Sequence, residues 1–425
     1  MAAGKNTWRY VVMSRMIVHI DMDAYFASIE QRDVPIYRNR PLVVCHTDDP
    51  SSYRGVVAAS SYEAREFGIK SGMSVLEAKL KAPNAIYVAG NYEKYLYNTG
   101  LLMQICEKYS DLVEVYSIDE AFLDITPTAR FFKSAEKAAA RLQNEIRDRL
   151  KLTCSIGVAP NKLVAKMASE LSKPASLTVI NASDLPEVVF PLPVDSIPGI
   201  GRRMRKHMDA LGIKTIGQLA FAPVELLKKK FGLVGEVLHR AALGVDDSPV
   251  IPTHQGVEIK SFGQSMSLGK GSTDIDCLCD VLLGLCEGAT RRMRKAGYLG
   301  RTVSVHVCLG RVFGISRQAS LGGYTDLPRR IYIAAKKLLL ALLDERASLD
   351  VYPVTKLGMS VTNLTRREFG QQLSVFDFLS EREAMLTSAI DQLKNRYGEK
   401  VVTRCSLLGL LGKYLGVSRA ELGMF

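Results

Sequence analysis

The order of strand and helix patterns near the N-terminus constrains the fold of this chain more than any other feature. The patterns are a strand (16–20), two helical stretches separated by an insert (24–31 and 92–109), two strands (113–116 and 121–125), a helix (134–150) and a strand (153–158). This β-α-β-β-α-β order is typical of the split-βαβ, ferredoxin-like arrangement, in which the first strand lies beside the hairpin formed by the next two. We therefore expect a ferredoxin-like sheet here.

A second set of patterns in the same order begins near residue 258. It comprises a strand (258–265), a helix (273–296), two strands (302–309 and 314–320), a helix (328–344) and a strand (355–362). We predict a second split-βαβ unit that shares the topology of the first and no visible sequence similarity with it. Residues 184–244 show short helical patterns punctuated by glycine, and residues 246–257 have the composition of a linker. The expected fold class is α+β.

The charge balance indicates a polyanionic partner. Lys and Arg number 56 against 44 Asp and Glu, which gives a formal net charge of +12. Such a surplus favours nucleic acid, although many basic proteins bind none. No apolar run reaches the roughly 18 residues of a membrane span, and residues 1–15 lack the apolar stretch of a secretory signal. We expect a cytoplasmic protein without membrane association, in which the eight cysteines, lacking any C-x-x-C pair, are reduced.

Acidic residues stand at strand ends that the ferredoxin-like order brings together. Asp21 and Asp23 follow the first strand, and Asp119 and Glu120 occupy the turn between the next two. Clustered carboxylates repel one another unless divalent cations such as Mg²⁺ neutralise them. Each position alone is more simply interpreted as an acidic residue in a turn, but the constellation indicates a metal site. Two metal ions can orient a hydroxyl and neutralise a leaving oxygen, which is the chemistry of nucleotidyl transfer, and we assign no protein general base.

Two motifs carry a resemblance to a known family. The segments MIVHIDMDAYFASIE (16–30) and YSIDEAFLD (116–124) resemble the Y-family (translesion) DNA polymerases, in particular the bacterial DNA polymerase IV branch, and the resemblance extends over about residues 16–365. It implies template-directed, error-prone transfer of deoxynucleotides from dNTP to a primer 3′ hydroxyl, without proofreading. It assigns Asp21, Asp119 and Glu120 to two Mg²⁺ ions, with the Met22 backbone carbonyl as a further ligand.

The resemblance also implies a division into domains. We expect a ferredoxin-like palm, small fingers, an all-helical thumb with a helix-hairpin-helix, and a split-βαβ little finger. The expected boundaries are an N-terminal extension (1–15), palm (16–34 and 86–183), fingers (35–85), thumb (184–245), linker (246–257), little finger (258–365) and a C-terminal tail (366–425).

The expected fingers carry a pair of residues suited to a triphosphate. Tyr62 and Arg65 stand three apart on a short helical pattern and therefore share a face, where both can donate to phosphate oxygens. By spacing alone, a surface Arg stacked on a Tyr is an equally good interpretation. The motif YEAREFG (62–68) resembles the family's triphosphate grip, and Lys173 in LSKP (171–174) matches its third ligand.

Further positions around the nucleotide are assigned by the resemblance. Phe26 aligns with the family's steric gate, where a bulky ring collides with a ribose 2′-hydroxyl, although plain core packing is the simpler interpretation of a Phe there. Val56 and Ala58 align with the lid over the nascent base pair. Tyr25 is also assigned to the nucleotide site.

Two regions are expected to hold DNA. Gly199 and Gly201 lie in a PGIG turn that opens a basic helix, and glycine lets backbone N–H groups approach a phosphate. The turn resembles the helix-hairpin-helix of Y-family thumbs, although a solvated basic face would look the same. In the second split-βαβ unit, Lys260, Ser261 and Arg317 can lie along a duplex backbone.

The tail contains a short motif for a protein partner. Gln372, Leu373 and Phe376 in QLSVF (372–376) resemble the bacterial sliding-clamp-binding pentapeptide, with Val375 where Leu is more usual. A Leu-x-x-Phe pair beyond a folded domain exposes apolar groups unless a partner or the chain's own little finger covers them. The expected partners are primer-template DNA, dNTP and the bacterial sliding clamp, bound by a monomer.

Two other functions are weighed against a polymerase. One is a catalytically idle accessory protein of mutagenic repair that binds the clamp and DNA, and the retention of Asp21, Asp119 and Glu120 argues against it. The other is nucleotide cyclisation on the same palm, which leaves the glycine turn and the clamp motif unexplained. A primer-extension assay with and without Mg²⁺ separates an enzyme from an accessory protein.

Overall fold

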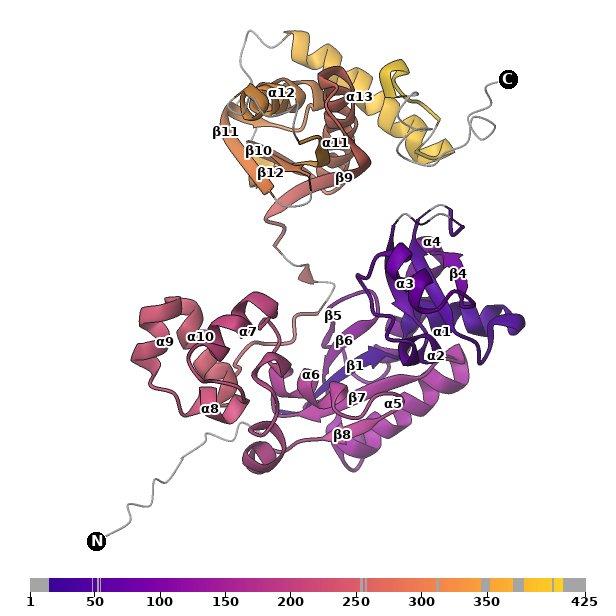
Figure 1. Ribbon diagram of the computed structural model, residues 1–425, viewed down its shortest axis with the longest axis vertical. Helices are drawn as coiled ribbons and strands as arrows, with labels where there is room; N and C mark the ends of the chain where they lie inside the picture. The colour runs from indigo at the N-terminus through magenta and orange to yellow at the C-terminus, as the bar shows by residue number, and fades with distance from the viewer. Residues whose placement is uncertain are drawn as a thin grey trace. The chain divides into compact units, whose positions relative to one another are not determined.

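The computed structural model describes residues 15–407 apart from residues 48, 52, 54, 253–254, 257, 311–312, 345–351, 370–377 and 400. The chain forms two units, Met1–Val257 and Glu258–Phe425, which are described separately (Figure 1). Both mix helices and strands. Among the described residues, no helix combines the length and the apolar character that crossing a membrane requires.

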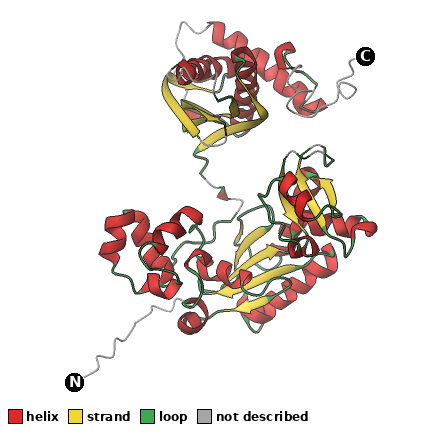
Figure 2. Cartoon of the chain, in the orientation of Figure 1, coloured by secondary structure: helices red, strands yellow, loops and turns green. Residues whose placement is uncertain are grey.

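A five-stranded sheet lies at the centre of the first unit (Figure 2). Its strands are β1 (Ile17–Met22), β5 (Val113–Val115), β6 (Glu120–Asp124), β7 (Cys154–Ala159) and β8 (Leu177–Val179). They lie in the order β5-β6-β1-β7-β8, and β1 is antiparallel to both β6 and β7. Because the first strand lies beside the β5–β6 hairpin, the predicted ferredoxin-like arrangement is confirmed. The short strand β8, which pairs in parallel with β7, was not predicted.

Different helices cover the two faces of this sheet. Helices on one face are α1 (Tyr25–Asp33), α4 (Tyr92–Cys106) and α5 (Ala135–Leu150), and on the other α6 (Lys162–Glu170). Val18 of β1 packs on the first face, whereas Ile17 packs with α6. Successive strand residues point to opposite faces, so His19 and Asp21 share the α6 face with Ile17. Cover on both faces explains why β1 is apolar up to Asp21 except at His19.

The insert between α1 and α4 forms a separate three-stranded sheet. Its strands β2 (Leu42–His46), β3 (Val56–Ser60) and β4 (Ile86–Ala89) lie in the order β3-β2-β4, with helices α2 (Tyr62–Glu66) and α3 (Val75–Lys81). Strand β4 pairs in parallel with β2 and was not predicted, because four residues are too few to show a strand period. It lies just beyond residue 85, where the insert was expected to end.

Short helices follow the sheet in the first unit. They are α7 (Arg202–Asp209), α8 (Ile216–Ala220), α9 (Val224–Phe231) and α10 (Leu233–Ala242). Residues 184–244, all of which are described, contain no strand, as predicted. In the segment that follows, Asp246 accepts the N–H of Leu163 at 3.0 Å, and Glu114 accepts the N–H of Ile251 at 2.8 Å. Part of the predicted linker is therefore fixed to the first unit.

The second unit contains a four-stranded sheet with two helices packed on one face. Its elements are β9 (Ser261–Ser272), α11 (Ile275–Lys295), β10 (Tyr298–Leu309), β11 (Phe313–Thr325), α12 (Pro328–Asp344) and β12 (Val354–Arg366), in the predicted order. The strands lie in the order β11-β10-β12-β9, so the β10–β11 hairpin borders the last strand, whereas the β5–β6 hairpin of the first unit borders the first strand. The prediction that both units share one topology is wrong, because element order does not determine which strand pairs with the hairpin.

A further helix of the second unit, α13 (Phe378–Tyr397), lies against α11. Asp391 of α13 accepts hydrogen bonds from Arg291 at 3.0 Å and from Arg294 at 2.7 Å. Burial opposes ionisation of Asp391, but the two guanidinium groups outweigh it and lower the pKa of this carboxyl. We call these three residues the Asp391 clasp.

Candidate active site

The end of β1 brings two of the predicted acidic residues together. Asp21 pairs directly with Glu120 across the β1–β6 ladder, and side chains opposite one another in such a ladder are neighbours on one face. That face is the one covered by α6. Asp21 is buried and Glu120 is half-buried.

Two lysines are the counter-ions of these carboxylates. Lys173 Nζ lies 2.6 Å from Asp21 and 2.9 Å from Glu170, and Lys166 Nζ lies 2.6 Å from Glu120. Burial raises the pKa of Asp21, and Lys173 opposes that effect. Burial also acts against the Glu120 charge, but its hydrogen-bonding and cationic neighbours outweigh it and lower its pKa to about 2. The negative charges of Asp21 and Glu120 are thus balanced by Lys166 on α6 and by Lys173 on the segment that follows it.

Asp21, Glu120 and Glu170 form an acidic cluster suited to a metal ion. One carboxylate oxygen from each lies within 4.8 Å of the others. Carboxylate oxygens are the protein ligands that Mg²⁺ prefers, so this donor set fits the predicted ion. Glu170 was missed by sequence reasoning. It is the last residue of α6, where the helix dipole disfavours a negative side chain, and that was the available signal.

The carboxylate of Asp119 lies apart from this cluster. Its Oδ1 accepts a hydrogen bond from the Ser117 hydroxyl at 2.5 Å. Its backbone carbonyl accepts the N–H of Met22 at 3.1 Å, which places the residue beside the end of β1. The structure therefore gathers two of the three predicted carboxylates and leaves the third on the adjacent turn. Without a divalent cation, a hydroxyl donor is a better partner for Asp119 than two further negative charges.

Asp23 connects three parts of the first unit. Its buried carboxylate accepts hydrogen bonds from the Ser155 hydroxyl and from the N–H of Ala175, both at 2.8 Å. The Tyr62 hydroxyl lies 3.5 Å from it. Asp23 thereby ties the end of β1 to β7, to the segment after α6 and to helix α2.

Helix α2 presents the two residues predicted to meet a triphosphate. Ser61 caps the helix by accepting the N–H of Ala64. The Arg65 guanidinium lies over the Tyr62 ring, 4.5 Å from its centroid, and its Nε donates to the Ser60 carbonyl at 3.2 Å. The two side chains share a face, as predicted. Their stacking also fits the alternative interpretation of their spacing, a surface Arg stacked on a Tyr.

The other residues assigned to the nucleotide differ in accessibility. Phe26 is half-buried and stacks on Tyr95, with ring centroids 4.2 Å apart. Tyr25 points into the core, where its hydroxyl donates to the Tyr95 carbonyl at 3.0 Å and burial raises its pKa to about 12. Val56 and Ala58 lie two apart on β3 and so share a face. The structure does not bring the Tyr25 phenol to the surface with Phe26.

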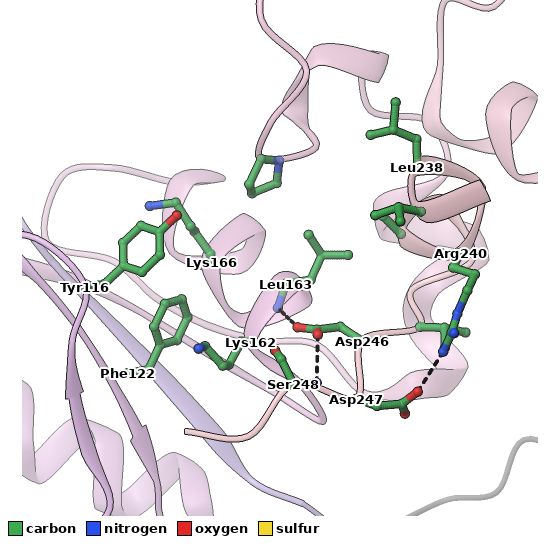
Figure 3. A pocket seen from close by; sticks show the side chains of 14 residues that line it. Tyr116, Phe122, Lys162, Leu163, Lys166, Leu238, Arg240, Asp246, Asp247 and Ser248 are labelled. Atoms are coloured by element: carbon green, nitrogen blue, oxygen red, sulfur yellow. Dashed lines mark hydrogen bonds and ion pairs between the residues drawn. The ribbon is translucent and has the colours of Figure 1, made fainter. Parts of the chain in front are cut away.

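A cavity of about 520 Å³ lies beside α6, between the large sheet and helix α10 (Figure 3). Tyr116 and Phe122 line it from the sheet, and Lys162 and Lys166 line it from α6. Each lysine ammonium lies 5.0 Å from an aromatic centroid, Lys162 over Phe122 and Lys166 over Tyr116. Because Lys166 also binds Glu120, the cavity adjoins the acidic cluster.

The predicted glycine turn faces the same helix. Gly199 has a φ of +99°, a left-handed conformation that favours glycine. A second cavity, of about 440 Å³, is lined by residues 195–201 together with Lys166 and Glu170 of α6. A Cβ added at Gly199 or Gly201 would meet no atom of the described chain within 4 Å, so this backbone is open to a ligand.

The residues predicted to hold DNA in the second unit lie on different faces of its sheet. Ser261 pairs with Thr362 on the polar face, opposite the core that α11 and α12 cover. Arg317 pairs with Val305, which belongs to that core, so its side chain leaves the sheet on the helix-covered side. Lys260 is exposed and precedes β9. The structure thus separates Arg317 from Ser261.

The tail is described only in part. Gln372, Leu373 and Phe376 lie outside the described residues, so the clamp-binding motif stays a prediction. The described part of the tail includes α13, which the Asp391 clasp holds against α11.

Comparisons with known proteins cover most of the chain. Models of the impB/mucB/samB family and of its C-terminal domain match residues 20–170 and 259–375, and a DNA polymerase-iota thumb domain model matches residues 195–246. DNA polymerase IV of Moorella thermoacetica is 38% identical over 95% of this chain and 98% of the relative. DNA polymerase IV 2 of Bacillus subtilis is 33% identical over 95% of this chain and 97% of the relative.

Solved structures agree with these relatives. The Y-family DNA polymerase chimera Dbh-Dpo4(243-245)-Dbh gives a TM-score of 0.72 at 28% identity, covering 83% of this chain and 99% of that chain. The chain belongs to the Y-family of DNA polymerases. The insertion ternary complex of Dbh DNA polymerase gives a TM-score of 0.56 at 28% identity over 83% and 99% of the two chains.

Family membership makes this Y-family polymerase a DNA-directed DNA polymerase of the DNA polymerase IV, translesion type. The architecture agrees with the palm, fingers, thumb and little finger expected of this family, and the five-stranded sheet is the ferredoxin-like palm sheet. The thumb-domain model covers residues 195–246, which include helices α7 to α10.

Proposed function

We propose that this polymerase transfers deoxynucleotides from dNTP to a primer 3′ hydroxyl with two Mg²⁺ ions, and that it does so with low fidelity and without proofreading. The observation that carries the proposal is the pairing of Asp21 with Glu120 at the end of β1, each with a lysine ammonium 2.6 Å away. Partly buried carboxylates brought this close need cations, and a catalytic metal site is the reason to keep them together.

The metal ligands in this proposal are Asp21, Asp119, Glu120 and the backbone carbonyl of Met22. Bound Mg²⁺ would lower the pKa of the primer hydroxyl and neutralise charge on the phosphates. Asp119 supports the proposal through its position one residue from Glu120. A single hydroxyl, that of Ser117, holds it off the cluster, and a divalent cation is a stronger partner for a carboxylate.

Three side chains would bind the triphosphate, namely the cations of Lys173 and Arg65 and the hydroxyl donor of Tyr62. Burial disfavours the Lys173 charge, but Asp21 and Glu170 outweigh that effect and raise its pKa, so the ammonium is fully charged near neutral pH. Its contact with Asp21 supports a place between the metal ligands and the phosphates. Arg65 is the group suited to bidentate contacts with phosphate oxygens.

Sugar and base selection would fall to Phe26, Val56 and Ala58. The Phe26 ring, held by its stack on Tyr95, is the proposed steric gate against a 2′-hydroxyl. Val56 and Ala58 are small residues on one face of β3 and are the proposed lid over the base pair. Tyr25 would act by fixing the start of α1, since its phenol is engaged in the core.

The primer end would enter the cavity beside α6, next to the acidic cluster. The open backbone at Gly199 and Gly201 would bind a primer phosphate, and Lys260 and Ser261 would contact the duplex backbone. Arg317 would contact DNA only from the helix-covered side of its sheet, at the edge strand β11.

The proposed context is a bacterial cytoplasm in which the enzyme works as a monomer on a sliding clamp. Gln372, Leu373 and Phe376 would bind the clamp, which would raise the concentration of the enzyme at primer ends. The motif itself is the support for this contact.

Primer extension with and without Mg²⁺ tests the proposed reaction. We expect wild-type extension to require the metal and Asp21→Asn to reduce the rate more than about a hundredfold, because a ligand is lost. Asp111→Asn, which changes an exposed carboxylate, is the matched control and should extend like wild type. Metal-independent extension, or an Asp21→Asn variant as fast as the control, would refute the proposal.

A further inference from the structure

A histidine lies beneath the acidic cluster. His19 is on β1, two residues before Asp21, and faces α6 with its side chain fully buried. Its ring packs on Phe122, with centroids 4.5 Å apart. Sequence reasoning assigned no protein general base and gave this residue no role, although His19 lies within the first acidic motif (16–30).

The two ring nitrogens of His19 have different surroundings. Nδ1 lies 2.7 Å from the hydroxyl of Ser169 on α6. Nε2 has no hydrogen-bond partner among the described residues, and the carboxylate that it faces is Glu120, whose Oε2 lies 3.7 Å away. Buried polar atoms without a partner are rare in native structures, so this one calls for an explanation.

The opposing carboxylate determines which nitrogen carries the proton. A lone pair on Nε2 would face a negatively charged oxygen, so the neutral ring favours a proton on Nε2. Nδ1 is then an acceptor. The Ser169 hydroxyl lies within hydrogen-bond distance of both this nitrogen, at 2.7 Å, and the Lys166 carbonyl, at 2.8 Å, and this tautomer requires it to donate to Nδ1. In this tautomer the His19 N–H points at Glu120.

Lys166 explains why this N–H is unused here. The Lys166 ammonium binds Glu120 Oε2 at 2.6 Å and holds the carboxylate short of hydrogen-bond distance from His19. Helix α6 therefore binds Glu120 directly through Lys166, and through Ser169 it contacts the His19 ring that faces Glu120. The His19 N–H becomes available to Glu120 when another cation replaces Lys166 as the partner of this carboxylate.

We propose that His19 is a positioning residue for Glu120, whose Nε2–H orients this carboxylate as a metal ligand once a divalent cation takes the place of Lys166. The inference rests on the proposed metal site. Carboxylates that bind metals are generally held by a hydrogen bond from a residue behind them, and loss of such a partner weakens metal affinity by roughly 10- to 100-fold. In this proposal His19 acts only through Glu120, so it is not a catalytic residue.

Two substitutions separate the roles of the ring nitrogens. The amide nitrogen of Gln lies near the place of Nε2, and that of Asn lies near the place of Nδ1. His19→Gln therefore keeps the donor toward Glu120, whereas His19→Asn keeps only the contact with Ser169. His19→Phe keeps the packing on Phe122 and removes both nitrogens.

The readout is binding of Mn²⁺, measured by electron paramagnetic resonance in the complex with dNTP and a primer that ends in a dideoxynucleotide. No turnover occurs, so the signal reports affinity alone. We expect His19→Gln to bind Mn²⁺ within about twofold of wild type, and His19→Asn and His19→Phe to bind roughly tenfold more weakly. Thermal melting of each variant shows that the compared proteins are folded.

Equal Mn²⁺ affinity in all variants, or equal loss in His19→Gln and His19→Asn, would overturn the positioning role. If His19→Asn fails to fold, His19→Phe serves as the variant without the donor; if His19→Gln fails to fold, wild type is the form with the donor, and equal Mn²⁺ affinity of wild type and the folded variants without the donor overturns the role. If wild type binds Mn²⁺ no better than Asp21→Asn, the proposed metal site is wrong, and this inference falls with it. The two failures are therefore distinguishable.

Discussion

Phe26 is the residue proposed to select the sugar of the incoming nucleotide. Its ring stacks on Tyr95 at 4.2 Å, so the core holds it in one position instead of leaving it free to swing aside. We expect Phe26→Ala to reduce discrimination against ribonucleotides by about tenfold or more while DNA synthesis stays measurable. The ratio of dNTP to rNTP incorporation in primer extension measures the effect. Phe131→Ala, which removes an exposed ring with no proposed role, is the control. Unchanged discrimination in Phe26→Ala would exclude the steric gate.

At the scale of single residues, the sequence predicted the contacts that follow from which strands are neighbours. Asp21 and Glu120 meet because the ferredoxin-like order makes their strands neighbours. His19 and Glu170 could not be predicted in the same way, because their part in the site depends on how closely α6 packs on the sheet. The separation of Asp119 from the cluster also escaped prediction, since it depends on one local hydrogen bond from Ser117.

At the scale of elements, the approach of α6 to the palm sheet depends on Gly157 of β7. A Cβ at this position would lie 2.0 Å from the Ala165 carbonyl oxygen and 2.5 Å from the Ser169 nitrogen, both backbone atoms of α6. We expect Gly157→Ala to push the helix outward and to destabilise the protein by about 3 kcal/mol or more. Denaturant unfolding followed by circular dichroism measures this loss.

Gly100→Ala is the matched control for that substitution. Gly100 lies in the interior of α4 and is exposed, and an added Cβ would meet nothing within 4 Å. It should stabilise the protein by up to about 1 kcal/mol, because alanine favours the helix. Similar stability of the two variants would show that α6 does not need the glycine.

The Asp391 clasp allows a second prediction at this scale. Asp391→Asn removes the charge that Arg291 and Arg294 share, so we expect α13 to detach from α11 and to be cleaved faster in limited proteolysis. Glu383→Gln, which changes an ion pair with a largely exposed Arg329, is the control and should have little effect. Equal cleavage of both variants would mean that the remaining contacts, among them those of Arg291 with Asn395 and Glu399, are enough to hold α13.

The pKa of Asp391 fixes the pH range of this clasp. Because its folded-state pKa lies below the ordinary value of 3.8, the stabilising contribution is fully present above that value and is lost as the pH falls through the lower folded-state pKa. Wild-type α13 should therefore be protected equally at pH 7 and pH 5.

Elements were more predictable than their pairing. The helices and long strands of both units follow from their apolar periodicity, whereas β4 and β8 are too short to show one. The strand order of the second unit could not be predicted from element order, because β9 and β12 can exchange the positions that β1 and β7 hold in the first sheet.

At the scale of the whole molecule, the tail is proposed to recruit the enzyme to a sliding clamp. Deletion of residues 372–376 should abolish clamp-stimulated synthesis and leave basal primer extension unchanged, because the residues proposed to bind metal, nucleotide and DNA all precede this segment in the chain. Val375→Leu, which installs the residue more usual in such motifs, should increase stimulation. Primer extension with and without added clamp measures both, and equal stimulation of the deleted form would refute the contact.

The central claim is that three carboxylates distant in sequence gather around two metal ions at one end of the palm sheet. The most direct test is a crystal structure with primer-template DNA, a non-reactive dNTP analogue and Mn²⁺, in which anomalous scattering locates the ions. The account predicts two peaks at about 2.1 Å from oxygens of Asp21, Asp119 and Glu120, with Asp119 released from Ser117. A bound nucleotide with Asp119 still on Ser117, and no ion between it and Asp21, would contradict the account.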